Sequence, residues 1–136
     1  SQRVVDYSVV PNCIFTMPEI ADVGLTVAQA KERGIAVNER RFPFSVNGRA
    51  LTLGEPEGQV RVVCEQLPAG DSGRVLGVHI MGPRAGDLIA EAALAMRLKA
   101  TAADIAHTIH AHPTLSEALM EASMAHQDGA IHYRQR

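Results

Sequence analysis

A histidine and a glutamate five residues apart form the part of this sequence best suited to chemistry. They are His112 and Glu117, within the segment 109–120, which reads IHAHPTLSEALM. An imidazole with an ordinary pKa near 6.5 exchanges protons at neutral pH, and a carboxylate beside its second nitrogen stabilises the imidazolium. The two residues are therefore candidates for a general acid–base pair. They also fit a structural role, in which Glu117 caps a helix and His112 is a loop residue.

Local signals place this pair at the start of a helix. Thr114 to Glu117 has the T-x-x-E pattern of a capping box, in which the threonine hydroxyl and the glutamate carboxylate each accept a backbone N–H of the other residue. Apolar residues at helical spacing predict a helix that runs to about Ala125 with one buried face. Pro113 restricts His112 to extended backbone geometry. We therefore expect the imidazole just before the helix, on a loop that the helix holds in place.

Other candidate ligands and nucleophiles are few. His107, His110 and His112 resemble a metal-ligand cluster, but their spacing crosses a helix end with no acidic or thiol ligand between them, which disfavours zinc. Cys13 and Cys64 are separated by 50 residues and lie in apolar strand-like segments, which fits neither a C-x-x-C motif nor a zinc ligand pair. We expect two buried free thiols and no metal site.

The sequence has none of the common motifs for binding phosphates or for activating a serine. It contains no G-x-G-x-x-G after a predicted strand, no P-loop and no G-x-S-x-G. A general base without a cofactor site or a nucleophile of its own implies that the rest of the active site lies on another polypeptide or on another portion of the gene product.

Length and charge narrow the class of protein. The 136 residues predict a single domain over 1–136, and a formal charge of −2 gives no basic face for nucleic acid and no polybasic patch for a membrane. No apolar run approaches 18 residues, and the first residues do not resemble a signal peptide. We expect a cytoplasmic protein that contacts neither nucleic acid nor membrane.

The pattern along the chain predicts an α+β domain, with a mostly antiparallel sheet and helices packed on one side. In the strand 59–65, Val60, Val62 and Cys64 should point inward, and in the returning strand 75–81, Leu76, Val78 and Ile80 should do the same. The expected strands are 9–16, 35–44, 59–65 and 75–81; the expected helices are 26–34, 86–98, 101–107 and 114–125; the expected turns or connections are 17–24, 47–48, 54–58 and 68–73.

Three segments together resemble a known family. They are VPNCIFTMPEIADVGLT (10–26), LGVHIMGPRAGDLIAEAALAM (76–96) and HAHPTLSEALMEAS (110–123). In this order they closely resemble the C-terminal interface domain of the dihydrolipoamide dehydrogenases, in the pyridine nucleotide–disulfide oxidoreductase family. The resemblance implies a domain through which two subunits form a homodimer. It also implies that the FAD and NAD domains of the parent are absent from this chain.

The resemblance gives the candidate site residues specific roles. It implies that His112 is the base that accepts a proton from the dihydrolipoamide thiol, with Glu117 as its carboxylate partner. The thiolate would attack a disulfide of the other subunit, and electrons would pass to FAD and finally to NAD+. It further implies a cis bond between His112 and Pro113, with the His112 carbonyl near the partner's flavin. His110 matches a position near the site, without a proton-transfer role.

The family also sets expectations for cofactors and partners. The parent would bind FAD and NAD and would join a 2-oxo acid dehydrogenase complex, whereas this chain alone would bind no cofactor and show no turnover. A glutathione-reductase-like parent is the weaker match, since that group shares H-P-T-x-x-E but generally lacks the HAHPTLSEA context, and mercuric reductase replaces the histidine. A stand-alone dimerisation or interaction module without catalysis is the remaining alternative.

Overall fold

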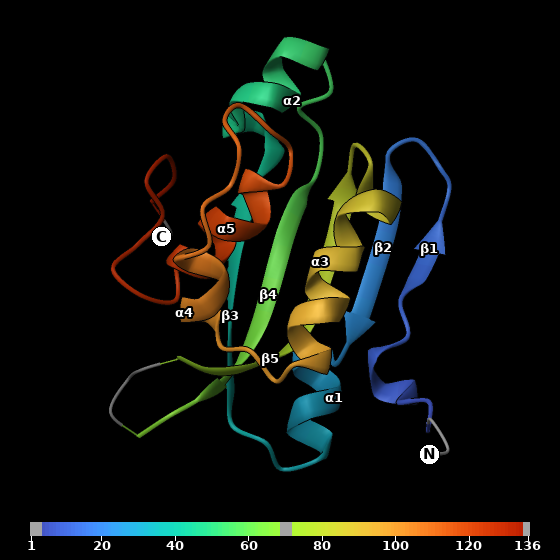
Figure 1. The fold of residues 1–136 in the computed structure, drawn as a ribbon, viewed down its shortest axis with the longest axis vertical. Coiled ribbons are helices and arrows are strands. Elements are labelled where there is room, and N and C mark those ends of the chain that lie inside the picture. The colour runs from blue at the N-terminus through green and yellow to red at the C-terminus, as the bar shows by residue number, and fades with distance from the viewer. Residues whose placement is uncertain (1–3, 69–71, 135–136) are drawn as a thin grey trace.

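The centre of the molecule is a five-stranded antiparallel sheet with the order β1-β2-β5-β4-β3 (Figure 1). The computed structural model describes residues 4–68 and 72–134. Residues 69–71 of the predicted 68–73 turn lie outside that range. The strands are β1 (Asn12–Ile14), β2 (Glu19–Gly24), β3 (Val37–Pro43), β4 (Gln59–Gln66) and β5 (Ser72–Gly82).

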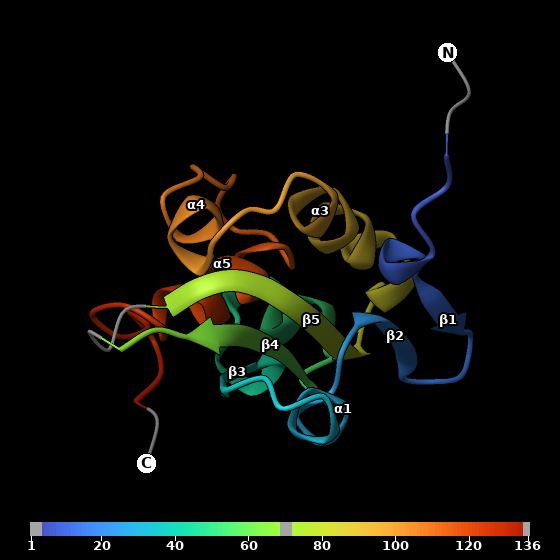
Figure 2. The ribbon, with the colours of Figure 1, turned by 90° about the horizontal axis from the view of Figure 1, so that it is seen from below.

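Most of the helical structure covers one face of this sheet. Figure 2 shows α3, α4 and α5 on that face and the short helix α1 on the opposite face. The helices are α1 (Val27–Glu32), α2 (Gly48–Leu53), α3 (Ala85–Arg97), α4 (Ala102–Ala106) and α5 (Glu117–Met124), with single 3-10 turns at Tyr7–Val9 and Phe44–Val46. The predicted α+β class is confirmed, and the structure adds that α1 lies apart from the main helical layer. Among the described residues, no helix has the length and apolar character needed to cross a membrane.

The core lies between the sheet and the three helices. The strands contribute mainly valine and phenylalanine, and the helices contribute alanine, isoleucine and leucine, so small helical residues let the layers approach closely. The largest of these buried side chains are Phe42, Phe44, Ile80, Ile89, Leu119, Val23, Val60, Val62 and Val78.

Two of the predicted helix starts are confirmed by reciprocal capping. Thr26 accepts the N–H of Gln29 through its hydroxyl, and the Gln29 side chain accepts the N–H of Thr26. Thr101 and Asp104 make the same exchange at the start of α4. These starts depend on residues three apart, which is why the sequence alone predicts them.

Two segments predicted as turns are regular elements instead. Residues 19–24 form β2, which pairs with both β1 and β5 and buries Ala21 and Val23. Pro18 directly precedes this strand and Gly24 is its last residue, so the two turn-forming residues at its ends led to the prediction of a turn. The predicted turn at Asn47-Gly48 is the beginning of α2, because the Asn47 side chain accepts the N–H of Ala50.

The predicted alternation holds in β4 and breaks in β5. Val60, Val62 and Cys64 are fully buried as expected. In β5, Val78 and Ile80 are buried, but Leu76 is only half-buried and Val75 takes the inward position. The register shifts between Val63 and Cys64 on β4, so that β5 carries an extra residue. Such a bulge reverses which residues face the core, and simple alternation does not reveal it.

Candidate active site

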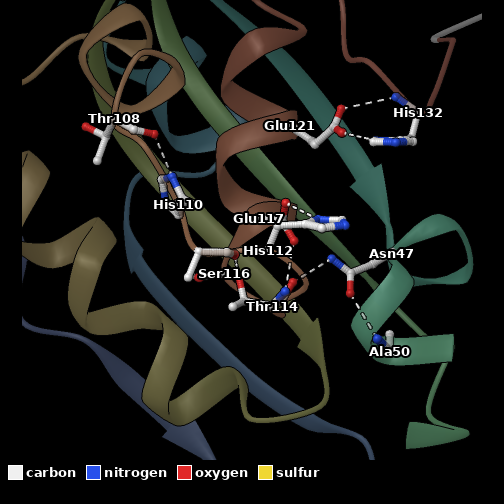
Figure 3. A network of polar contacts seen from close by, with 11 residues as sticks. Asn47, Ala50, Thr108, His110, His112, Thr114, Ser116, Glu117, Glu121 and His132 are labelled. Carbon is white, nitrogen blue, oxygen red and sulfur yellow. Dashed lines mark hydrogen bonds and ion pairs between the residues drawn. The ribbon is translucent and has the colours of Figure 1, made fainter. Parts of the chain in front are cut away.

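The predicted pair lies where the loop between α4 and α5 meets the start of α5 (Figure 3). His112 lies on this loop and Glu117 is the first residue of α5. The imidazole Nδ1 lies 2.9 Å from the Glu117 carboxylate Oε1. The structure therefore brings the two predicted residues into direct contact, and the His112–Pro113 bond is cis.

The two partners differ in their access to solvent. The His112 side chain is 73% exposed, whereas the Glu117 side chain is 17% exposed. Because Nδ1 faces a carboxylate, we assign its proton to the hydrogen bond, which leaves the Nε2 lone pair available to an incoming molecule. The arrangement suits a base whose imidazole is open to a substrate from solvent, while the less accessible Glu117 carboxylate orients the imidazole.

The local environment keeps Glu117 ionised. Burial acts to raise the pKa of this carboxyl, but the Thr114 backbone N–H and the His112 side chain hydrogen-bond to it and outweigh burial, so the pKa lies below its ordinary value. The Thr114 N–H donates to Oε2 at 2.8 Å, while His112 contacts Oε1. Each carboxylate oxygen thus has a separate donor, which orients the group toward the imidazole.

The capping box predicted at Thr114 is only half present. Glu117 does accept the Thr114 N–H, but the Thr114 hydroxyl donates to the Ala111 carbonyl at 2.7 Å. The helix accordingly begins at Glu117, three residues later than predicted. The threonine side chain closes the loop on itself and keeps the residues before and after His112 close together.

Asn47 braces the loop from α2, a role that no local signal in the sequence indicates. Its amide nitrogen donates to the Thr114 carbonyl at 3.0 Å, and its Oδ1 accepts the Ala50 N–H at 2.9 Å (Figure 3). The side chain is buried. The residue therefore ties the start of α2 to the loop, across 67 positions of sequence.

The other candidate ligands and thiols do not join this pair. His107 is exposed at the end of α4, His110 is directed inward, and no group of three potential metal ligands forms within the described part of the chain. Cys13 and Cys64 are free thiols, as expected; Cys64 is buried, whereas Cys13 is only half-buried. Burial, followed by the nearby Glu65 charge, raises the pKa of Cys64 to about 12, so it remains a protonated thiol at neutral pH.

The chain matches one protein family over most of its length. The model of the pyridine nucleotide-disulphide oxidoreductase dimerisation domain matches residues 10–123. A mitochondrial dihydrolipoyl dehydrogenase of Pisum sativum is 47% identical over 128 residues, which are 94% of this chain and 25% of the relative. A dihydrolipoyl dehydrogenase of Thermus scotoductus is 50% identical over 127 residues, 93% of this chain and 27% of the relative.

A solved structure agrees with these sequence matches. The crystal structure of LpdA from Mycobacterium tuberculosis superposes with a TM-score of 0.81 at 28% identity, over 90% of this chain and 26% of that chain. This chain thus spans about a quarter of the length of the relatives it matches. The family match covers both His112 and Glu117. The chain therefore belongs to the pyridine nucleotide–disulphide oxidoreductase family, in which it corresponds to the dimerisation domain of the dihydrolipoyl dehydrogenases.

Proposed function

We propose that this chain is the dimerisation domain of a flavin-dependent dihydrolipoamide dehydrogenase, and that His112 is the base that deprotonates the dihydrolipoamide thiol. The observation that carries this proposal is the contact of an exposed imidazole with a largely buried, ionised carboxylate. The relatives named dihydrolipoyl dehydrogenase support the choice of substrate.

The chemistry assigned to the pair is a single proton transfer. A thiol with an ordinary pKa of about 8.5 is mostly protonated at pH 7, so a base is needed to make the thiolate. The thiol S–H bond breaks, its electron pair stays on sulfur, and the proton goes to His112 Nε2. The imidazolium then donates through Nδ1 to the Glu117 carboxylate, which stabilises the positive charge formed in this step.

The cofactors FAD and NAD belong, in this proposal, to the rest of a longer protein. The sequence has no glycine-rich dinucleotide motif, while His112 and Pro113 are both exposed, which fits a flavin held outside this domain. The bound flavin supplies electron transfer from the thiol to NAD+. The His112 backbone carbonyl and Pro113 would lie against the flavin of the partner subunit.

The proposal includes a homodimer and a place in a 2-oxo acid dehydrogenase complex. Large apolar side chains are exposed on the described surface, among them Phe15, Met17 and Ile109, and a second subunit would remove them from water. Ile109 lies on the same loop as His112, so a subunit packed there would also approach the imidazole. The cytoplasmic setting stays a prediction, because the relatives include a protein named as mitochondrial.

The decisive experiment replaces His112 with glutamine in the full-length protein. We expect lipoamide-linked NADH formation to fall by a factor of about 10² to 10⁴, the usual contribution of a general base. His107→Gln, an exposed histidine at the end of α4, is the matched control and should keep activity. Near-normal activity in the His112 variant would exclude the base role and favour an interaction module without catalysis.

A further inference from the structure

A second imidazole–carboxylate pair lies next to the first. The His110 Nε2 lies 2.7 Å from Oε1 of Glu91, which projects from α3. The His110 side chain is only 5% exposed and that of Glu91 is 35% exposed. This imidazole is therefore packed between its loop and α3, whereas His112, two residues on, lies in solvent.

Both ring nitrogens of His110 face oxygen acceptors. Nδ1 lies 2.8 Å from the Thr108 carbonyl, as Figure 3 shows, and Nε2 faces the Glu91 carboxylate. A carbonyl cannot donate, so Nδ1 must carry a hydrogen, and Nε2 also carries one when Glu91 is ionised. The ring has no free lone pair in that state. It therefore cannot take a proton from a substrate, and its contacts are those of a connector.

The connection restrains the loop that presents His112. His110 joins the loop to α3 through Glu91, and Asn47 joins it to α2 through the Thr114 carbonyl. His112 lies between these two attachment points. A carboxylate–imidazole hydrogen bond is among the stronger side-chain contacts, and here it is partly buried, with the imidazole less accessible to water than the carboxylate.

We propose that Glu91 and His110 are positioning residues for the proposed reaction: their partly buried hydrogen bond holds the loop so that His112 Nδ1 stays on Glu117. The catalytic part of this inference rests on the proposed function, whereas the positional part concerns the His112–Glu117 contact alone. Burial raises the pKa of Glu117, but the Thr114 and His112 hydrogen bonds outweigh it, and His110 adds a smaller electrostatic contribution in the lowering direction, which links the two pairs.

Two substitutions of Glu91 separate the hydrogen bond from the charge. In Glu91→Gln, the amide N–H can donate to a neutral His110 whose Nδ1 still donates to Thr108, so the connection survives without charge. In Glu91→Ala, the connection is lost. A positioning role therefore predicts that glutamine largely preserves the function and alanine does not.

The experiment measures kinetics and the His112 tautomer in the full-length protein. In Glu91→Ala we expect kcat for lipoamide-linked NAD+ reduction to fall about tenfold with KM within about twofold, since misplacement of a reacting group lowers the rate of the chemical step. In Glu91→Gln both should stay within about twofold. Nitrogen NMR of labelled histidine, with His112→Gln to identify the signal, should show the Nδ1–H tautomer in the wild type and in Glu91→Gln. In Glu91→Ala it should show a shift toward Nε2–H.

A third pair provides the matched control. Glu121, buried on α5, bonds to His132 Nδ1 and to the Ile131 N–H, so it has the same chemistry but ties down the C-terminal segment. Glu121→Ala should lower the melting temperature and leave the His112 tautomer and kcat unchanged.

Three outcomes are decisive. The inference is overturned if folded Glu91→Ala keeps the wild-type tautomer and kcat, or if Glu91→Gln is impaired as much as Glu91→Ala. If His112→Gln stays active while the tautomer still follows the Glu91 connection, the proposed function fails and the positional inference stands.

Discussion

Two imidazole–carboxylate pairs on one loop show how exposure decides what a histidine can do. The His112–Glu117 pair leaves one ring nitrogen free, on a side chain that is 73% exposed. The His110–Glu91 pair engages both ring nitrogens, on a side chain that is 5% exposed. The same two functional groups thus leave a ring nitrogen available to an incoming molecule in one place and engage both ring nitrogens in the other.

The position of each residue in the loop produces this difference. Residues 108–113 belong to no helix or strand, and His110 points toward Glu91 of α3 while His112 points toward Glu117 (Figure 3). One residue, Ala111, separates them, and its carbonyl accepts the Thr114 hydroxyl. A shift of the loop by two residues would be needed to bring one histidine into the environment of the other, so the contacts on both sides of His112, His110–Glu91 and Asn47–Thr114, decide which imidazole is accessible.

The largest expected effect on this comparison comes from removing the charge of Glu117. Glu117→Gln should lower kcat about 100-fold in the full-length protein, because the imidazolium loses its anionic partner while the helix start is preserved. Steady-state lipoamide reduction of NAD+ measures it. Combined with His112→Gln, the substitution should cost little more than His112→Gln alone, since the carboxylate acts through the imidazole. Additive losses in the double variant would show that Glu117 has a separate role.

A smaller effect is expected from the brace on α2. Asn47→Ala removes the cap of α2 and leaves the Thr114 carbonyl without its side-chain donor, so the free energy of unfolding should fall by about 2 kcal/mol. Urea unfolding measures this change. Asn47→Asp is the informative control, because it can still cap α2 but cannot donate to Thr114. If the Asn47→Asp variant kept full stability, the bond to the loop would contribute nothing, and only the His110 side would hold the loop.

The candidate pair could be predicted from the sequence because its signals are local. Glu117 follows Thr114 by three residues, and the histidine–proline pair directly precedes them, so the spacing alone placed a carboxylate near an imidazole. The starts of α1 and α4 were predicted for the same reason, through Thr26 and Thr101. Interactions between residues within one turn of a helix are visible in a single sequence.

The two contacts that hold the loop, His110–Glu91 and Asn47–Thr114, could not be predicted from the sequence because they connect distant residues. Glu91 precedes His110 by 19 residues and Asn47 precedes Thr114 by 67. Nothing in the spacing of such residues shows that α3 and α2 will pack beside the loop. Asn47 with Gly48 is also a common turn pair, and only tertiary contacts select the helix-capping alternative. The bulge in β5 at Leu76 is a third case in which pairing with another strand decides what local alternation cannot.

Another buried imidazole, that of His126, gives the smallest expected effect and tests how the surroundings of a buried histidine set its pKa. His126 is buried like His110, but its Nε2 faces the Val62 carbonyl at 3.0 Å and the Arg40 cation lies nearby. Burial lowers the pKa of His126 to about 4, the hydrogen bond to Val62 opposes this, and Arg40 adds to the lowering. His110 faces a carboxylate, whereas His126 faces a carbonyl, and burial of the His126 ring is the main cause of its lowered pKa.

This difference predicts a distinct dependence of stability on pH. In the unfolded chain His126 titrates with a pKa near 6.5, whereas in the folded chain its pKa is about 4. Between these two pH values the imidazole is protonated in the unfolded state and neutral in the folded state, which favours unfolding. The stabilisation is complete above pH 6.5 and is lost as the pH falls toward 4. Between pH 6.5 and pH 5 the free energy of unfolding should drop by about 1.5 kcal/mol, measured by urea unfolding.

The pH range from 5 to 6.5 separates the contribution of His126 to the free energy of unfolding from the contributions of the carboxylates. Glu117, whose pKa is lowered, contributes stability that is present above its unfolded pKa near 4.5 and is lost only below it, so it leaves pH 5 to 6.5 unaffected. His126→Gln, which can still donate to the Val62 carbonyl, should flatten the profile in this window. An unchanged slope in that variant would assign the pH dependence to another group, and burial of His126 would then contribute no pH-dependent stability.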